Sequence, residues 1–371
     1  MIKEFSDPLY GFVRVGEAGL RLIDSFPFQR LRYVKQLGLA YLVFPSAQHT
    51  RFEHSLGVYH ITERICESLK VKEKELVKLA GLLHDLGHPP FSHTTEVLLP
   101  RERSHEDFTE RVIKETEIYE ILKQDYSHED IERLVRITLG KPEDEEEKLL
   151  SEIITGEFGS DRMDYLRRDA YFCGVSYGFF DYDRLISTLR VYENKVVVDE
   201  SGLRALENFL ISRYFMYVQV YFHKVVRILS IHLVEFLKKL ISQEDFTDIN
   251  NFLRLNDAFV ISELFKRKAF REDFERIFQR KHFKTLLSTE NYEKFSETKE
   301  RLLEKFPQEK VRFDEVEKEV YGGNIYVLSS EGLKKAHELS PLIASLKPIK
   351  LYRIYVDRQL WEKARSELKL S

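Results

Sequence analysis

The chain has 371 residues, of which 43% are hydrophobic and 32% are charged, with a formal net charge of -4. This length allows two or three domains with a substantial core. The slight negative charge argues against non-specific wrapping of nucleic acid, because such binding neutralises phosphates with Lys and Arg. No stretch approaches the roughly 20 apolar residues that cross a bilayer, and residues 1–7 lack the apolar core of a signal peptide. We therefore expect a globular cytoplasmic protein with no membrane partner.

The first half of the chain reads as a short β element followed by helices. Residues 10–15 alternate weakly and are bounded by turn residues, which is typical of a strand or hairpin. Apolar residues then recur at helical spacing over 25–38, 54–69, 73–85 and 104–156. Gly87 and Pro89-Pro90 must break the third helix, so the residues that follow it stand on irregular backbone. The acidic run 141–148 is predicted to be a solvated connector.

The second half mixes helices and strands. Residues 192–199 predict a β-hairpin arm around Asn194, and 203–240 predict one long helix. The segments 321–328 and 349–356 are strand-like and are separated by a predicted helix over 333–346. The expected organisation is a core over 1–240, a helical extension over 241–305 and a small α+β subdomain over 306–371. Cys66 and Cys173 are expected to be reduced core thiols.

Histidines and carboxylates suited to a metal are concentrated in three short blocks. Leaving His60 aside as a packed helix residue, six of the twelve histidines lie between His49 and His105. Imidazole together with carboxylate suits Fe, Mn, Co, Ni or Zn better than Ca, which prefers oxygen ligands. The blocks supply four ligands of the right type for one such ion: His54, His84, Asp85 and Asp161.

Ligation of one metal by these four residues leaves other histidines free for proton transfer. His93, with Glu96 three positions later, is a candidate general acid with a carboxylate to orient it. His105 and His88 are its rivals or helpers. The spacing alone does not choose among the three histidines.

Two helical stripes carry polar residues suited to a substrate. Arg51 lies one turn before His54, and Tyr165, Arg168 and Asp169 follow Asp161 at offsets of four, seven and eight. Tyr165 and Asp169 could instead simply buttress the ligand helix. A second stripe of cations and phenols is better suited to a polar pocket wall than to a core; it comprises Arg213, Tyr217, Tyr221 and Lys224.

Several blocks in this order resemble one enzyme family. The blocks are Asp7-Pro8-Leu9-Tyr10-Gly11, 28–32, 51–58, His84-Asp85, His105-Glu106, 161–169 and 213–224. Together they resemble the HD-domain phosphohydrolases, in particular the branch of deoxynucleoside triphosphate triphosphohydrolases, over roughly residues 1–230. The resemblance implies a mainly α protein, with an HD-domain helical core, the N-terminal hairpin, the hairpin arm and the C-terminal α+β subdomain.

The resemblance also implies roles for the site residues. The adjacent His84-Asp85 pair would bind one divalent metal with His54 and Asp161, while Mg²⁺ accompanies the nucleotide. The Tyr165 and Asp169 positions contact the sugar, the Tyr221 position packs against the deoxyribose, and the Arg162 and Arg213 positions hold phosphates; Arg51 and Lys224 complete the predicted substrate contacts. Tyr217 departs from the vertebrate pattern, which has His there. Water would attack the α-phosphate of a dNTP, with dGTP the best single guess.

Other functions remain open at this point. One is an HD-family hydrolase of nucleoside monophosphates, cyclic dinucleotides or guanosine polyphosphates, which the separated cations of the second stripe disfavour. Another is a nucleotide-sensing or nucleic-acid-binding module, for which the basic and aromatic residues of 265–284 are the best support. An amphipathic helix with its phenylalanines packed inward explains that segment as well. The resemblance further suggests a homo-oligomer and an activating nucleotide as candidate partners.

Overall fold

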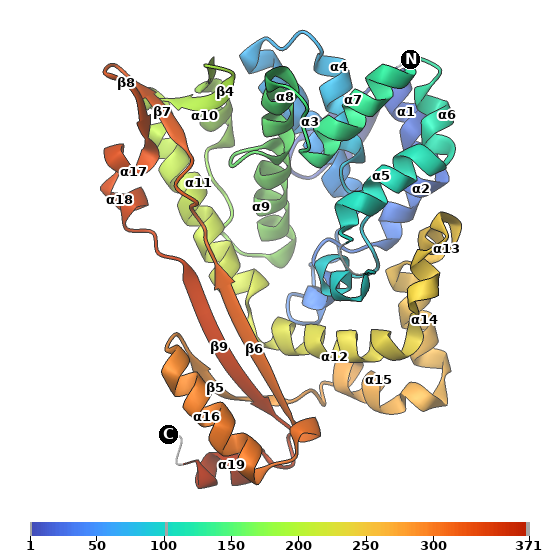
Figure 1. The fold of residues 1–371 in the computed structure, drawn as a ribbon, viewed down its shortest axis with the longest axis vertical. Coiled ribbons are helices and arrows are strands. Elements are labelled where there is room, and N and C mark those ends of the chain that lie inside the picture. Colours follow the sequence, from blue (N-terminus) through green and yellow to red (C-terminus); the bar gives the residue numbers. More distant parts are fainter. Residues whose placement is uncertain (1, 101–102, 369–371) are drawn as a thin grey trace.

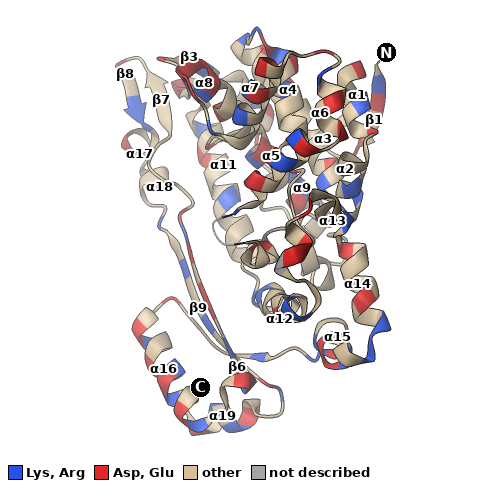
Figure 2. Ribbon diagram, turned by 45° about the vertical axis from the view of Figure 1, so that its right-hand side comes forward, with Lys and Arg blue, Asp and Glu red and all other residues tan. Residues whose placement is uncertain are grey.

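The computed structural model describes residues 2–100 and 103–368. A helical body contains most of the chain, and a long pair of strands leads from it to a small C-terminal subdomain (Figure 1). Acidic and basic residues are interspersed along the helices of both parts (Figure 2). None of the described helices is long and apolar enough to cross a membrane.

The predicted N-terminal hairpin is present. Strand β1 (Lys3–Asp7) pairs antiparallel with β2 (Gly11–Val15), with Lys3 opposite Val15 and Asp7 opposite Gly11. Gly11 has φ of +74° at the end of the turn, a conformation that suits glycine. Val13 and Val15 are fully buried, so one face of the hairpin closes the helical core.

The body is built from short and medium helices that share one apolar core. They are α1 (Glu17–Ile23), α2 (Phe26–Gln29), α3 (Arg51–Leu69), α4 (Lys74–Leu83), α5 (His105–Glu115), α6 (Glu117–Leu122), α7 (His128–Leu139), α8 (Glu145–Thr155), α9 (Ser160–Cys173), α10 (Tyr182–Ser187) and α11 (Leu203–Met216). Capping boxes begin α3, α5 and α7, in which the N-cap is Thr50, Ser104 or Ser127. Cys66 and Cys173 are buried free thiols, as predicted.

The helix predicted over 25–38 is wrong in its second half. Helix α2 ends at Gln29, a single 3-10 turn covers Arg30–Tyr33, and Val34 is already extended. The backbone of the next residues bonds to residues 49–50 instead of forming helical hydrogen bonds. Lys35 pairs with Thr50 as an isolated bridge, and the Gln36 amide donates to the carbonyl of His49. This tertiary pairing outweighs the local helical pattern.

The long helix predicted over 203–240 is interrupted. After α11, a π-helical turn covers Tyr217–Tyr221, and His223 is extended with ψ of 127° before α12 (Lys224–Leu240) begins. A π turn changes the angular spacing of side chains along a helix. The residues before and after the break therefore do not share one helical face.

The C-terminal region leaves its own subdomain to pair with the body and then returns to the subdomain. The predicted arm is β3 (Leu189–Tyr192) paired with β4 (Lys195–Asp199), and β7 (Tyr326–Ser329) pairs parallel with β4. The helix predicted over 333–346 is instead β8 (Gly332–Lys335) followed by two single turns, α17 (Ala336–Leu339) and α18 (Pro341–Ala344). Pro341 lacks an amide proton and so cannot continue α17.

The subdomain is an antiparallel sheet with helices. Helices α13 (Ile249–Arg254), α14 (Asp257–Lys266) and α15 (Arg271–Phe278) form the helical extension. The sheet order is β5-β9-β6, and its elements are β5 (Lys284–Thr289), α16 (Tyr292–Lys305), β6 (Val311–Lys318), β9 (Ile349–Val356) and α19 (Trp361–Glu367). Leu287 of β5 and Phe295 of α16 belong to the same separate core as Ile354. The subdomain therefore begins near residue 283 instead of 306.

The structure also bears on the predictions for the acidic run 141–148 and for His60. The acidic run 141–148 is not wholly solvated, because the side chain of Glu147 is 2% exposed and pairs with Arg136 over 2.5 Å. His60 stacks on the ring of Tyr10 with centroids 4.9 Å apart, which agrees with its reading as a packing residue.

Candidate active site

The four residues predicted to bind a metal meet at one point. His54 lies on α3, His84 and Asp85 follow the end of α4, and Asp161 lies in the first turn of α9. His54 Nε2 is 3.1 Å from Asp161 Oδ1 and 3.2 Å from His84 Nε2, and His84 Nε2 is 3.2 Å from Asp85 Oδ1. Segments more than 100 residues apart in sequence thus bring two imidazole nitrogens and two carboxylates together.

This donor set fits a divalent metal ion. Ligand atoms about 2.0 to 2.2 Å from one ion lie roughly 3 to 3.5 Å from one another. Three of the distances have this spacing, whereas His54 Nε2 is 3.6 Å from Asp85 Oδ2 and His84 Nε2 is 3.7 Å from Asp161 Oδ1. The mixture of imidazole and carboxylate favours first-row transition ions. The residues present therefore support a divalent metal at His54, His84, Asp85 and Asp161 without showing which metal it is.

Buried hydrogen bonds orient the two histidines. His84 Nδ1 lies 2.8 Å from the carbonyl of Gly81, and His54 Nδ1 lies 2.8 Å from Asp164 Oδ2. Such bonds at Nδ1 leave Nε2 of each ring directed at the metal position. Burial lowers the pKa of His54, but its bonds to Asp161 and Asp164 outweigh burial and raise that pKa to about 10.

Asp164 is a supporting residue that the sequence reasoning missed. It is fully buried, and it also accepts hydrogen bonds from Tyr10 Oη over 2.8 Å and from Arg168 Nε over 2.8 Å. A Cβ atom at Gly57 would lie 1.9 Å from Asp164 Oδ1, so α3 needs glycine one turn after the histidine ligand. Tyr10 and Asp164 both lie in motifs that resemble the family, but no sequence periodicity indicates that the hairpin contacts α9.

Arg51 is fixed beside the metal ligands. It is 3% exposed, and its Nη1 lies 2.5 Å from Asp85 Oδ2 while its Nε donates to Ser92 Oγ over 2.7 Å. Burial raises the pKa of Asp85, but Arg51 and the neighbouring histidines outweigh it and hold that pKa well below its usual range. Asp85 is therefore ionised, as a metal ligand must be.

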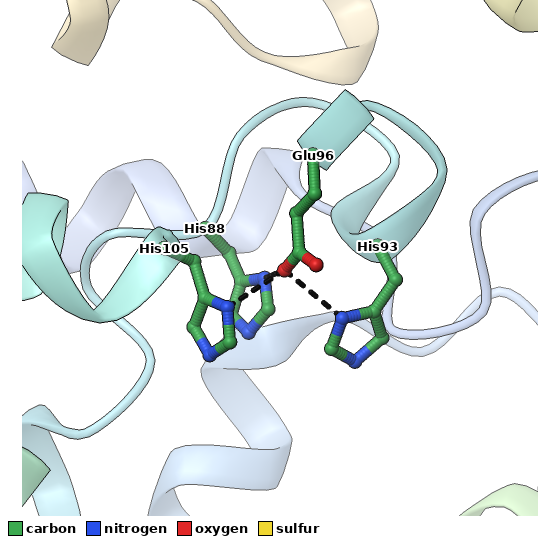
Figure 3. A group of neighbouring side chains, drawn as sticks. All are labelled: His88, His93, Glu96 and His105. Carbon is green, nitrogen blue, oxygen red and sulfur yellow. Dashed lines mark hydrogen bonds and ion pairs between the residues drawn. The ribbon is translucent and has the colours of Figure 1, made fainter. Parts of the chain in front are cut away.

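The other three histidines surround one carboxylate (Figure 3). Glu96 Oε1 lies 2.7 Å from His105 Nδ1, 3.0 Å from His93 Nδ1 and 3.7 Å from His88 Nδ1. The rings of His88 and His105 stack with centroids 4.1 Å apart. His88 Nε2 lies 3.2 Å from Asp85 Oδ1, which links this cluster to the metal ligands.

The protonation states within the cluster are pushed apart by their surroundings. Burial, together with Arg51 and His105, lowers the pKa of His88 well below its usual value, so this ring is neutral. Burial lowers the pKa of His105 too, but Glu96 outweighs burial and raises it. The two histidines that bond Glu96 likewise outweigh its burial and lower its pKa, so the carboxylate stays ionised. Groups held in different states are suited to proton transfer.

A cavity of about 890 Å³ opens beside both clusters. Its volume lies within the range of small-molecule sites. Arg51 and Ser92 line it near the metal ligands, and His93 lines it from the histidine cluster. The His93 side chain is 70% exposed, whereas that of His88 is 2% exposed. All three candidate general acids are among the described residues, and only His93 lines the cavity.

The lining of the cavity also includes residues that are predicted to contact the sugar. Tyr165, Asp169 and Tyr221 all line it, and Tyr221 Oη donates to Asp169 Oδ2 over 2.7 Å. His49 Nε2 lies 2.8 Å from the other carboxylate oxygen. Burial raises the pKa of Tyr165 and of Tyr221, so both phenols stay protonated.

Gln36 is a lining residue that the sequence reasoning missed. It is 9% exposed, and its Oε1 is buried without a hydrogen-bond partner among the described residues. A buried amide oxygen left unpaired costs free energy unless a ligand or water satisfies it. The sequence pattern predicts a helix for its segment and gives Gln36 no role, whereas in the structure the Gln36 backbone amide donates to the His49 carbonyl.

Three of the residues predicted to bind the substrate lie outside the lining of the cavity. Arg162 and Arg213 both point to Glu157, each with an Nη1 atom 2.9 Å from Glu157 Oε2. Lys224 is exposed at the start of α12. The break at His223 explains this position, because the predicted stripe assumed one continuous α-helix. The part played by these cations stays a prediction.

Comparison with known proteins places this geometry in a family. Residues 51–169 match the HD domain, and residues 180–351 match the HD associated region. The chain is 35% identical to an uncharacterized protein of Methanocaldococcus jannaschii, over 94% of this chain and 76% of that relative. The chain belongs to the HD-domain phosphohydrolase superfamily. The paired His84-Asp85 that suggested the resemblance lies within the matched domain.

Other relatives of this HD-domain protein carry a named activity. The deoxynucleoside triphosphate triphosphohydrolase SAMHD1 of Gallus gallus is 33% identical over 64% of this chain and 45% of its own. The SAMHD1 homolog of Dictyostelium discoideum is 31% identical over 69% of this chain and 51% of its own. The chain thus spans about half the length of these enzymes.

A solved structure agrees with the fold. A phosphohydrolase of Bacteroides thetaiotaomicron superposes with a TM-score of 0.80 at 25% identity, covering 96% of this chain and 100% of that one. The mainly α HD fold predicted from the sequence is therefore confirmed.

Proposed function

We propose that this HD-domain protein is a metal-dependent triphosphohydrolase that cleaves dNTPs at the α-phosphate, with dGTP the best single guess. The observation that carries the proposal is the cavity itself. It joins Arg51, beside the metal ligands, to a polar wall of Gln36, Asp169 and Tyr221. A nucleotide can thus place its sugar on the wall and its α-phosphate near the metal ligands.

The chain supplies proton transfer and positioning for this reaction. A divalent ion on His54, His84, Asp85 and Asp161 supplies Lewis acidity and activates water for attack on phosphorus. His93 faces the cavity and would give a proton to the leaving oxygen, while Glu96 holds its ring through Nδ1. His105 pairs with Glu96 over 2.7 Å, and the buried ring of His88 stacks on His105. We therefore assign these two histidines to support instead of direct proton transfer.

The polar wall accounts for recognition of a sugar. Gln36 Oε1 lacks a partner among the described residues, and Asp169 is held between His49 and Tyr221. Both residues line the cavity, and we propose that Asp169 accepts a hydrogen bond from a sugar hydroxyl. The Tyr221 ring occupies space beside them and would exclude a second hydroxyl.

The remaining parts of the proposal concern metal and partners. Fe, Mn, Co, Ni or Zn would occupy the HD site, and Mg²⁺ would accompany the nucleotide. A homo-oligomer, an activating nucleotide and a cytoplasmic location belong to the same proposal. Nucleic acid is not favoured as a partner, because the net charge of the chain is -4. In the basic segment, the ring of Phe265 contacts Phe274 and Phe278 but is still 59% exposed.

The test is a product analysis with purified protein. Each dNTP is incubated with Mg²⁺ and with each candidate transition metal in turn, and the products are separated by ion-exchange chromatography. We expect deoxynucleoside and intact triphosphate. The pair dNDP and orthophosphate would show that attack is at another phosphorus. Turnover of monophosphates or cyclic dinucleotides but not dNTPs would favour another branch of the superfamily.

A further inference from the structure

Glu157 lies between Arg162 and Arg213, the two arginines that the resemblance noted in the sequence assigns to the phosphate chain. It belongs to the loop between α8 and α9, while Arg162 is in the first turn of α9 and Arg213 is in the last turn of α11. One oxygen of Glu157, Oε2, lies 2.9 Å from Nη1 of each arginine. A single carboxylate thus bridges two guanidinium groups from different helices.

The arrangement is largely shielded from solvent. The side chain of Arg213 is 5% exposed, and those of Glu157 and Arg162 are 31% and 23% exposed. Arg213 Nε is buried without a hydrogen-bond partner among the described residues. Burial raises the pKa of Glu157, but the two arginines outweigh it and lower that pKa, so the bridge is ionic.

The ion pairs remove most of the positive charge that a phosphate chain needs. Two guanidinium groups and one carboxylate leave one net positive charge, and Arg51 is likewise paired with Asp85. Phosphate oxygens that approach these arginines meet the negative charge of Glu157 in a partly buried setting, where like charges repel strongly. The full affinity of the arginines is available only after Glu157 leaves them.

We propose that Glu157 is an internal counter-ion that the polyphosphate tail of the substrate displaces from Arg162 and Arg213. This inference rests on the proposed function, because it takes the two arginines as the tail-binding cations. Glu157 then sets the threshold for binding: a tail with several negative charges competes for both arginines, whereas a single phosphate competes poorly. The residue therefore favours long phosphate chains and weakens binding of all of them.

The alternative roles of Glu157 predict different behaviour. A carboxylate that only holds the arginines in place would weaken tail binding when it is removed. A carboxylate that binds Mg²⁺ carried by the tail would act only when Mg²⁺ is present. Displacement predicts tighter binding on removal of the charge, with or without Mg²⁺.

The experiment measures binding of inorganic tripolyphosphate by titration calorimetry, first without added divalent ions and then with Mg²⁺. Glu157→Gln removes the charge and keeps the size, and we expect it to tighten binding by about 5- to 50-fold. Glu157→Asp keeps the charge and should bind like the wild type. Glu207→Gln is the matched control, because Glu207 pairs with Arg204 over 2.6 Å elsewhere on α11. Thermal melting establishes that each variant is folded.

Each outcome is decisive. Equal or weaker binding by Glu157→Gln overturns the counter-ion role and leaves the tail site in place. A difference seen only with Mg²⁺ overturns it in favour of a metal bridge. If neither the wild type nor Glu157→Gln binds tripolyphosphate, the tail site of the proposed function fails, and the counter-ion fails with it.

Discussion

The hydroxyl of Tyr10 donates a hydrogen bond to Oδ1 of Asp164 over 2.8 Å, across 154 residues of sequence. The other oxygen of Asp164 lies 2.8 Å from His54 Nδ1. The N-terminal hairpin is therefore connected to a candidate metal ligand through two hydrogen bonds. Carboxylates that hold a ligating imidazole orient its ring and increase its basicity, so the hairpin contributes to the metal site.

We expect Tyr10→Phe to weaken metal binding by up to about 10-fold, because Tyr10 bonds Asp164 and not the ligand itself, whose direct partners are worth roughly 10- to 100-fold. The variant keeps the ring that stacks on His60 and removes only the hydroxyl. Titration with Co²⁺, followed by its visible absorption, measures the dissociation constant. Tyr59→Phe is the control, because Tyr59 is also buried but its ring lies against Lys78. Equal affinities in all three proteins would show that the Tyr10 bond is structural only.

Asp161→Ala should abolish metal retention as well as turnover, because it removes a charged oxygen ligand from the set of four. Elemental analysis of the purified variant gives the metal content per chain. Asp169→Ala is the matched comparison: it lies on the same helix and lines the cavity, so it should keep the metal and lose substrate binding. Full metal occupancy in Asp161→Ala contradicts the ligand assignment.

Tyr221→Ala should raise turnover of GTP relative to dGTP without changing metal content. The Tyr221 ring would clash with the 2′-hydroxyl of a ribonucleotide and leave that hydroxyl without a hydrogen-bond partner. Such exclusion costs on the order of 1 to 3 kcal/mol, which is roughly a 5- to 150-fold preference for the deoxyribonucleotide. Tyr221→Phe removes only the hydroxyl that bonds Asp169, so it should keep the discrimination. If the wild type already hydrolyses both nucleotides equally, or Tyr221→Ala keeps full discrimination, the gate lies elsewhere.

Asp257 gives a pH prediction. Its buried carboxylate accepts from the amides of Phe91 over 2.7 Å and Lys35 over 3.0 Å. Burial outweighs these bonds and raises its pKa to about 6, above the unfolded value near 3.9. The stability that this group contributes is therefore present below about pH 4 and is lost as pH rises through 6.

The measurement is the free energy of unfolding in urea for the wild type and Asp257→Asn. We expect the wild-type value minus the variant value to fall by up to about 3 kcal/mol between pH 4 and pH 7. The subtraction cancels the pH-dependent contributions to stability of the carboxylates that both proteins share. A difference that does not change with pH would show that Asp257 titrates normally.

The candidate metal ligands could be named from the sequence because each stands in a short block with rigid neighbours, and the structure brings these residues together. His84, Asp85 and the Pro-Pro turn are local signals, and the chemistry of imidazole and carboxylate does not depend on the rest of the fold. The N-terminal hairpin, the mainly α class and the arm around Asn194 were likewise predictable, since alternation and turn residues act over a few positions.

Other elements depended on contacts that no periodicity records. The helix predicted through Lys35 gives way to pairing with Thr50 and to a bond with Asp257 from α14. The π turn at Tyr217–Tyr221 breaks a stripe that looked continuous, which leaves Lys224 exposed. Strand β7 joins β4 instead of the C-terminal sheet, because pairing partners are chosen by three-dimensional proximity.

The sequence by itself determined which chemical groups are available to the candidate site, because those groups occur in compact motifs. Only the tertiary structure decided how they are held and restrained. Tyr10 bonds Asp164 from the N-terminal hairpin, Gln36 lines the cavity from a segment predicted as helix, and Glu157 pairs with Arg162 and Arg213. Their roles arise from buried hydrogen bonds and ion pairs, which form only when distant segments pack together and exclude water.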